Sequence, residues 1–102
     1  MQVERHGYAK VVLPEKLTIS NANEFKETLQ TLFDQGYIAV ELDFRKLEVI
    51  DSTGLGKLLL FQKVLKEQGG ELKIINLEND FVRKMFNLIQ LHKIIRIEEK
   101  KE

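Results

Sequence analysis

Residues 37–44 read Tyr-Ile-Ala-Val-Glu-Leu-Asp-Phe, and this stretch decides the fold. Apolar and polar residues alternate with the period of a β-strand. One face of the strand therefore carries Ile38, Val40, Leu42 and Phe44. The other carries Glu41 and Asp43, which must be solvated or paired with cations. Because a strand covered by helices on both sides reads as a continuous apolar run, the alternation predicts a sheet with its helices mainly on one face.

A helix is predicted immediately before this strand. Apolar residues recur there at helical spacing: Ala22, Phe25, Leu29, Leu32 and Phe33. Asn21 and Glu24 form a plausible capping pair, and Gly36 is a typical C-terminal stop. Further upstream, Gln2–Arg5 and Tyr8–Leu13 are predicted to pair across the His6-Gly7 turn. The only proline, Pro14, ends that hairpin.

After the deciding strand, the apolar strand end Val49-Ile50 leads directly into a second helix. This helix starts in Asp51-Ser52-Thr53-Gly54-Leu55-Gly56 and runs to about Gln68. The Gly69-Gly70 pair is its stop, and residues 71–76 read as the next strand.

A third helix is expected after Asn79 or Asp80, either of which could cap it. The helix is predicted to carry Phe81, Met85 and Leu88, with Met85 in the core by its helical spacing and Phe86 at the rim. Residues 94–97 read as a last strand or a helical turn, and residues 98–102 as a solvated tail.

Strand–helix–strand connections of this length make successive strands parallel, with right-handed crossovers. The sequence therefore predicts one small α/β domain over residues 1–102. Its sheet is mostly parallel and four- to five-stranded, with an N-terminal antiparallel hairpin and helices mainly on one face.

Composition narrows the classes of function. The chain has 102 residues, of which 43% are hydrophobic, enough for one small core. Sixteen basic residues balance sixteen acidic ones, so no overall charge favours a nucleic acid or membrane partner. There is no cysteine, no apolar signal segment and no apolar run long enough to cross a bilayer. We expect a cytoplasmic protein.

The hexapeptide 51–56 places two hydroxyl groups at a helix start. A helix N-terminus offers unpaired N–H groups and the positive end of the helix dipole, which together accommodate an anion such as a phosphate. Ser52 or Thr53 could equally serve only as the helix cap. Gly54 and Gly56 each weaken a helix, so either a partner approaches them closely or the helix start packs tightly on a neighbouring strand.

The second helix is more apolar than one buried stripe requires. Leu58, Phe61 and Leu65 form the core line, while the flanks carry Leu55, Leu59, Leu60 and Val64. Neighbouring elements could cover these flanks, or an exposed flank beside Ser52 could bind a partner.

The inventory for catalysis is poor. A Ser52–His92–Asp51 triad is unsupported because Asp51 adjoins Ser52 and cannot readily orient a distant imidazole. No metal-ligand spacing and no glycine-rich nucleotide loop is present, so we expect no enzyme, no metal and no cofactor. Glu41 and Asp43 could pair as acid and base, although solvated or lysine-paired side chains explain them more simply.

The chain resembles the STAS domain family, and in particular stand-alone bacterial anti-sigma factor antagonists. The likeness rests on the Asp-Ser-Thr-Gly-Leu-Gly motif of residues 51–56, on residues 40–44 before it, and on residues 69–72 and 91–95 after it. The resemblance implies that Ser52, or less strongly Thr53, is phosphorylated by a partner anti-sigma factor that is a serine kinase. A serine phosphatase would then restore the unmodified state.

The resemblance also implies which residues contact that partner: Thr18, Asp51, Thr53, Gly54, Leu55, Gly56 and Leu59. Thr18 ends the stretch 15–18, Glu-Lys-Leu-Thr, where the family usually has an aspartate. The alternative to a switch is therefore a constitutive interaction or scaffold module that is not phosphorylated. A weak homodimer, through a sheet edge or an apolar helix flank, is also open.

Overall fold

Strand β4 (Ala39–Asp43) lies at the centre of a five-stranded sheet. The computed structural model describes residues 1–98. The strand order is β1-β2-β4-β6-β7, and only the β1–β2 hairpin is antiparallel. The other strands are β1 (Gln2–Arg5), β2 (Ala9–Val12), β6 (Glu71–Ile75) and β7 (Arg96–Ile97). The hairpin and the parallel sheet predicted from the sequence are thus confirmed.

A second, two-stranded parallel sheet pairs β3 (Lys16–Leu17) with β5 (Val49–Ile50). Strand β3 was not predicted, because two residues are too few to show a periodic pattern. This small sheet sets the segment before the first helix beside the start of the second.

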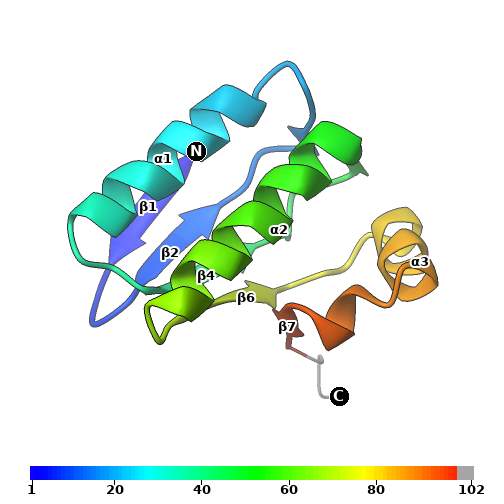
Figure 1. Cartoon of the computed structure of the whole chain (residues 1–102). Helices are drawn as coiled ribbons and strands as arrows, with labels where there is room; N and C mark the ends of the chain where they lie inside the picture. The colour runs from blue at the N-terminus through cyan, green and yellow to red at the C-terminus, as the bar shows by residue number, and fades with distance from the viewer. Residues whose placement is uncertain (99–102) are drawn as a thin grey trace.

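The helices α1 (Ala22–Asp34) and α2 (Ser52–Glu67) lie side by side over one face of the sheet (Figure 1). Helix α3 (Asp80–Leu88) and the short 3-10 helix η1 (Leu91–Lys93) lie past the C-terminal end of β6. They connect that strand to β7, which is the edge strand of the sheet. The one-sided arrangement predicted from residues 37–44 is confirmed.

The core fills the space between this sheet face and the helices. Parallel register aligns Val40 with Leu72 and Leu42 with Ile74, and all four side chains are buried. Phe44 follows β4 and meets Phe86 of α3 in an edge-on contact, with ring centroids 5.9 Å apart. This contact joins α3 to the main core.

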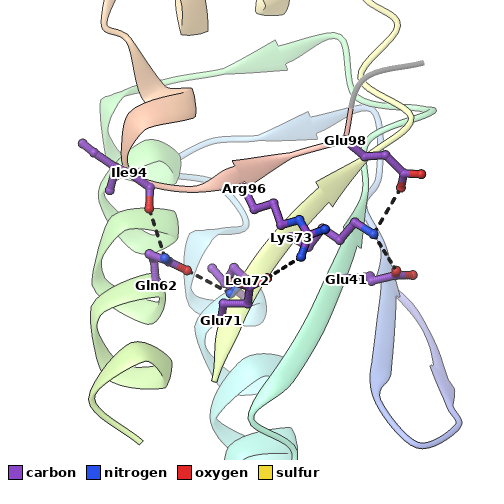
Figure 2. Close-up of polar contacts among 8 residues, drawn as sticks. All are labelled: Glu41, Gln62, Glu71, Leu72, Lys73, Ile94, Arg96 and Glu98. Atoms are coloured by element: carbon purple, nitrogen blue, oxygen red, sulfur yellow. Dashed lines mark hydrogen bonds and ion pairs between the residues drawn. The ribbon is translucent and has the colours of Figure 1, made fainter. Parts of the chain in front are cut away.

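The opposite sheet face is polar, and its charges are paired. Glu41 lies 3.8 Å from the ammonium of Lys73, which also lies 3.5 Å from Glu98 (Figure 2). Asp43 is fully buried between Arg45, at 2.9 Å, and Lys10, at 3.7 Å. The simpler interpretation of the two carboxylates, pairing with cations, is therefore the correct one.

The predicted capping pair of α1 is wrong. The Asn21 side chain makes no capping bond to α1. Instead its Oδ1 accepts a hydrogen bond from the Thr18 backbone N–H at 2.9 Å, and its Nδ2 donates to the Lys16 carbonyl at 2.8 Å. Glu24 pairs with the N-terminal ammonium at 3.3 Å. Asn21 thus holds the loop before the helix instead of the helix itself.

The predicted position of Phe86 at the rim of α3 is also wrong. Val82 and Phe86 are buried, whereas Phe81 and Leu88 are exposed and Met85 is half-buried. The helix carries two apolar stripes. The stripe that packs on the core is the one that brings Phe86 into contact with Phe44. Ile38 also differs from expectation, since it precedes β4 and lies at the surface. Of the predicted tail, Glu98 is exposed, and residues 99–102 lie outside the described residues.

Candidate functional site

Asp51 caps α2. Its backbone is extended (φ −107°, ψ −178°), and its Oδ1 accepts a hydrogen bond from the Gly54 N–H at 2.8 Å. This bond satisfies one of the donors that a helix start leaves free. The alternative in which Ser52 or Thr53 is the cap is therefore wrong, and the first residue of the helix is Ser52.

The second carboxylate oxygen of Asp51 holds the loop between β3 and α1. Its Oδ2 accepts a hydrogen bond from the Ile19 N–H at 2.9 Å. The bonds from Gly54 and Ile19 hold the pKa of this carboxyl below its usual value of 3.8, because they stabilise the charged form. Asp51 thus joins two segments separated by 32 residues.

Gly54 brings that loop and α2 into direct contact. A Cβ at this position would run into the carbonyl oxygen of Leu17 and would lie 2.9 Å from the Leu17 Cγ. The tight-packing interpretation of Gly54 is therefore correct. A Cβ at Gly56, in contrast, would meet nothing within 4 Å, and Gly56 is exposed. Only Gly56 leaves bare surface for a partner.

Ser52 is exposed and Thr53 is half-buried. Within the described residues the Ser52 hydroxyl makes no hydrogen bond, because Asp51 performs the capping. A hydroxyl that is exposed, unbonded and at the first position of a helix is free to be modified. Of the two hydroxyls, that of Ser52 belongs to the more exposed residue.

Thr18 is brought to the same site, although it does not contact Ser52 by any hydrogen bond among residues 1–98. Its Oγ1 lies 2.8 Å from the Ser20 Oγ, so its hydroxyl is used within the loop. The next residue, Ile19, is 77% exposed. Sequence analysis did not single out Ile19. Its one sequence signal is that it is the only apolar residue between Thr18 and Asn21.

The apolar flanks of α2 are covered unequally. Leu55 and Leu59 are half-buried and pack on the core, whereas Leu60, on the opposite flank, is 45% exposed. Gln62 follows Leu55 and Leu59 on their flank and is buried. Its Nε2 donates to the Ile94 carbonyl at 3.0 Å, and its Oε1 accepts from the Leu72 N–H at 2.9 Å (Figure 2). Sequence analysis also missed this residue, which joins α2 to β6 and to the segment after η1.

A separate cavity of about 870 Å³ lies between the polar sheet face and α3. The cations that line it already have partners. Lys73 pairs with Glu41 and Glu98, Arg96 pairs with Glu71 at 3.3 Å, and Arg83 donates to the Leu77 carbonyl at 2.9 Å.

No group of three metal-ligating side chains occurs within residues 1–98, and no helix there is long and apolar enough to cross a bilayer.

The arrangement around Asp51 can be compared with known proteins. The profile of the STAS domain matches residues 1–102. The chain belongs to the STAS domain family. It is also 32% identical over 93 residues to the anti-sigma-B factor antagonist of Bacillus subtilis, covering 91% of this chain and 84% of that one.

Solved STAS structures agree on the fold. A candidate anti-sigma factor antagonist from Thermotoga maritima superposes with a TM-score of 0.85 at 25% identity, covering 97% of this chain and 86% of that one. The anti-sigma factor antagonist SpoIIAA of Bacillus, in its phosphorylated form, gives 0.73 at 20% identity, covering 97% and 91%. The anti-sigma factor antagonists among these homologues are non-enzymatic regulators.

Proposed function

We propose that this STAS protein is an anti-sigma factor antagonist that acts in the cytoplasm and is switched at Ser52. In its unmodified form it binds an anti-sigma factor through the site around α2 and thereby frees a sigma factor. The anti-sigma factor is also a serine kinase, and phosphorylation releases it. A serine phosphatase restores binding.

The observation that carries the proposal is the division of labour between Asp51 and Ser52. Asp51 makes the capping bond, so the exposed Ser52 hydroxyl has no structural task among the described residues. Similarity to the B. subtilis antagonist supports the class of partner. Ile19, Gly56 and the half-buried Leu55 lie on the two segments that Asp51 joins, and they support docking there.

The transfer itself is simple. The Ser52 oxygen attacks the γ-phosphorus of ATP, the bond to the β-phosphate oxygen breaks, and ADP leaves. The serine proton passes to a base on the kinase. The product adds about 1.5 to 2 negative charges and strong acceptor oxygens. A negative charge at a helix N-terminus is favourable, so α2 stays folded and the change acts on the bound partner by repulsion and bulk.

The experiment incubates the protein with its purified anti-sigma factor and ATP, then maps the phosphate by mass spectrometry. We expect one phosphate on Ser52, none on Ser52→Ala, and normal modification of Thr53→Ala. Ser52→Asp should lose binding to the anti-sigma factor, while Ser52→Ala binds as the unmodified protein does. A phosphate elsewhere, or none while Ser52→Ala behaves as wild type, would overturn the proposal.

One observation favours the second candidate, a constitutive interaction or scaffold module. Thr18 occupies the position of the usual family aspartate, and its hydroxyl is used by Ser20, so the loop beside Ser52 carries no acidic group of its own. Such a module would bind its partner with equal affinity as wild type and as Ser52→Asp. Loss of binding by Ser52→Asp decides for the switch.

A further inference from the structure

The exposed stripe of α3 and the turn after it form a second apolar surface. We define the α3 patch as Phe81, Met85, Leu88 and Ile94. Phe81 is 65% exposed, Leu88 84% and Ile94 53%, and Met85 is half-buried. Phe81, Met85 and Leu88 follow the i, i+4, i+7 spacing of one helix face. This stripe is additional to the core stripe of Val82 and Phe86, and only Met85 of its residues packs against the core.

The α3 patch lies in a segment whose charges have one sign. From Phe81 to Ile97 the sequence contains Arg83, Lys84, Lys93 and Arg96 but no aspartate or glutamate. Lys84 follows Phe81 by one turn and precedes Leu88 by one turn, so it stands within the stripe. Lys93 adjoins Ile94. Both lysines are exposed, and neither has an ion pair within residues 1–98.

These charges decide which occupant fits. A second copy docked by the same patch would bring Lys84 and Lys93 of the two chains together, which like-charge repulsion disfavours. An occupant with an apolar groove and acidic side chains around it is complementary. Anchors at i, i+4 and i+7 on a short helix are the pattern by which a helix enters the apolar groove of a partner protein.

One residue of the α3 patch, Ile94, lies against the flank of α2 that carries Leu55 and Leu59. Leu55, Leu59 and Gln62 share one flank of α2 at intervals of one turn, and the Gln62 side chain reaches the Ile94 carbonyl at 3.0 Å. Figure 2 shows that carbonyl turned toward Gln62 and the Ile94 side chain turned away. A protein seated on Leu55 and Leu59 would therefore lie about one helical turn from the contact of Gln62 with Ile94.

We infer that the α3 patch is a second contact for the anti-sigma factor, which meets it with an apolar groove rimmed by carboxylates. This inference rests on the proposed function. It adds that affinity is divided between two contacts and that a phosphate on Ser52 acts on only one of them. The α3 patch would hold the kinase on its substrate without taking part in the transfer.

The test titrates the purified anti-sigma factor with wild type and with the double variant Phe81→Gln/Leu88→Gln. The matched control is Leu60→Gln, an exposed apolar residue on the other flank of α2. We expect the double variant to bind at least about tenfold more weakly, as for loss of central apolar anchors, and the control to bind as wild type. In the kinase reaction the same variant should raise KM and leave kcat unchanged, because it removes only binding.

Circular dichroism first establishes that the double variant is folded, which its exposed positions lead us to expect. If wild type binds and the double variant binds within twofold of it, this inference is overturned and the proposed function stands. If wild type binds no anti-sigma factor, the proposed function fails and this inference fails with it. Wild type and the double variant are also tested with phosphatidylglycerol vesicles and with duplex DNA. If the double variant loses binding to either of these but still binds the anti-sigma factor as wild type does, the inference is overturned in favour of that ligand.

Discussion

Helices α2 and α3 begin in the same way. Each follows a residue whose side chain accepts a hydrogen bond from the backbone three residues later: Asp51 from Gly54 at 2.8 Å, and Asn79 from Val82 at 3.0 Å. They differ in what else holds them. Asp51 also binds Ile19, and Gly54 packs on Leu17, so the start of α2 is fixed to a second segment.

Among residues 1–98 the cap of α3 makes no such second contact, and one of the two apolar stripes of this helix is exposed. A cap therefore defines where a helix starts but not which of its side chains are available to a partner. Contacts with distant segments decide that. Five predictions test this difference, from the largest expected effect to the smallest.

Replacing Gly54 should destabilise the protein most. In Gly54→Ala the added methyl group meets the Leu17 carbonyl, and we expect a loss of about 3 kcal/mol in the free energy of unfolding, measured in urea. Gly56→Ala is the matched control. It meets open space and should stabilise α2 by up to about 1 kcal/mol. Equal effects at the two glycines would refute the tight contact.

Gln62 links α2 to the segment that follows α3. Gln62→Leu leaves the Leu72 N–H and the Ile94 carbonyl without their partner, and we expect a loss of about 2 kcal/mol. Hydrogen exchange at the Leu72 amide should accelerate. Gln68→Leu, at an exposed position, should change stability by less than about 0.5 kcal/mol.

The two caps can be compared directly. Asn79→Ala should cost about 1 kcal/mol, the usual value for a cap. Asp51→Ala should cost more than Asn79→Ala, because the bond from Ile19 is lost together with the capping bond. Both losses in the free energy of unfolding are to be measured by urea unfolding at pH 7. A smaller loss for Asp51→Ala would contradict the second role of this carboxylate.

Acid should weaken the start of α2 and not that of α3. The pKa of Asp51 is lowered in the folded protein, so its stabilisation is complete above the unfolded value and is lost as the pH falls through the folded value. Stability should therefore decrease as the pH falls below about 4. Asn79 does not titrate.

Asp51→Asn should flatten this acid dependence in part. Asp43 keeps a contribution of the same sign: burial alone would raise its pKa, but bonds from Arg45 and Asn76 and the charge of Lys10 lower it overall. Asn79→Ala should leave the slope as in wild type. An unchanged slope in Asp51→Asn would show that this carboxyl does not contribute.

The smallest effect on stability is expected at the exposed stripe of α3. Phe81→Gln/Leu88→Gln should change the free energy of unfolding by no more than about 0.5 kcal/mol, because both side chains are mostly in water. Thermal unfolding beside wild type measures it. A loss near that of a core substitution would place this stripe in the fold instead of at a surface.

The elements that the sequence predicted well are those with one unambiguous pattern. The strand at residues 37–44 has a single apolar face, and its alternation predicted the one-sided sheet. Helix α3 has two adjacent apolar stripes, and the period cannot choose between them. Only the position of Phe44 decides for Phe86, and that position depends on the whole sheet.

The candidate site divides in the same way. The motif 51–56 marked the helix start, and its capping residue lies within it. The contacts with Leu17 and Ile19 depend on a loop more than 30 residues away in the chain, brought close by the pairing of β3 with β5. No local pattern carries that information. The sequence therefore could not decide whether Gly54 packs on a strand or faces a partner, and it could not predict a role for Ile19.

The paired charges on the open sheet face have one further consequence. Lys10, Glu41, Asp43 and Lys73 neutralise one another there, so a visiting protein would have to strip water from satisfied ion pairs and would gain little in return. That face therefore offers little binding free energy to a partner protein. A fluorophore or a surface tether placed on the sheet side should therefore leave the proposed binding site on the helical side undisturbed.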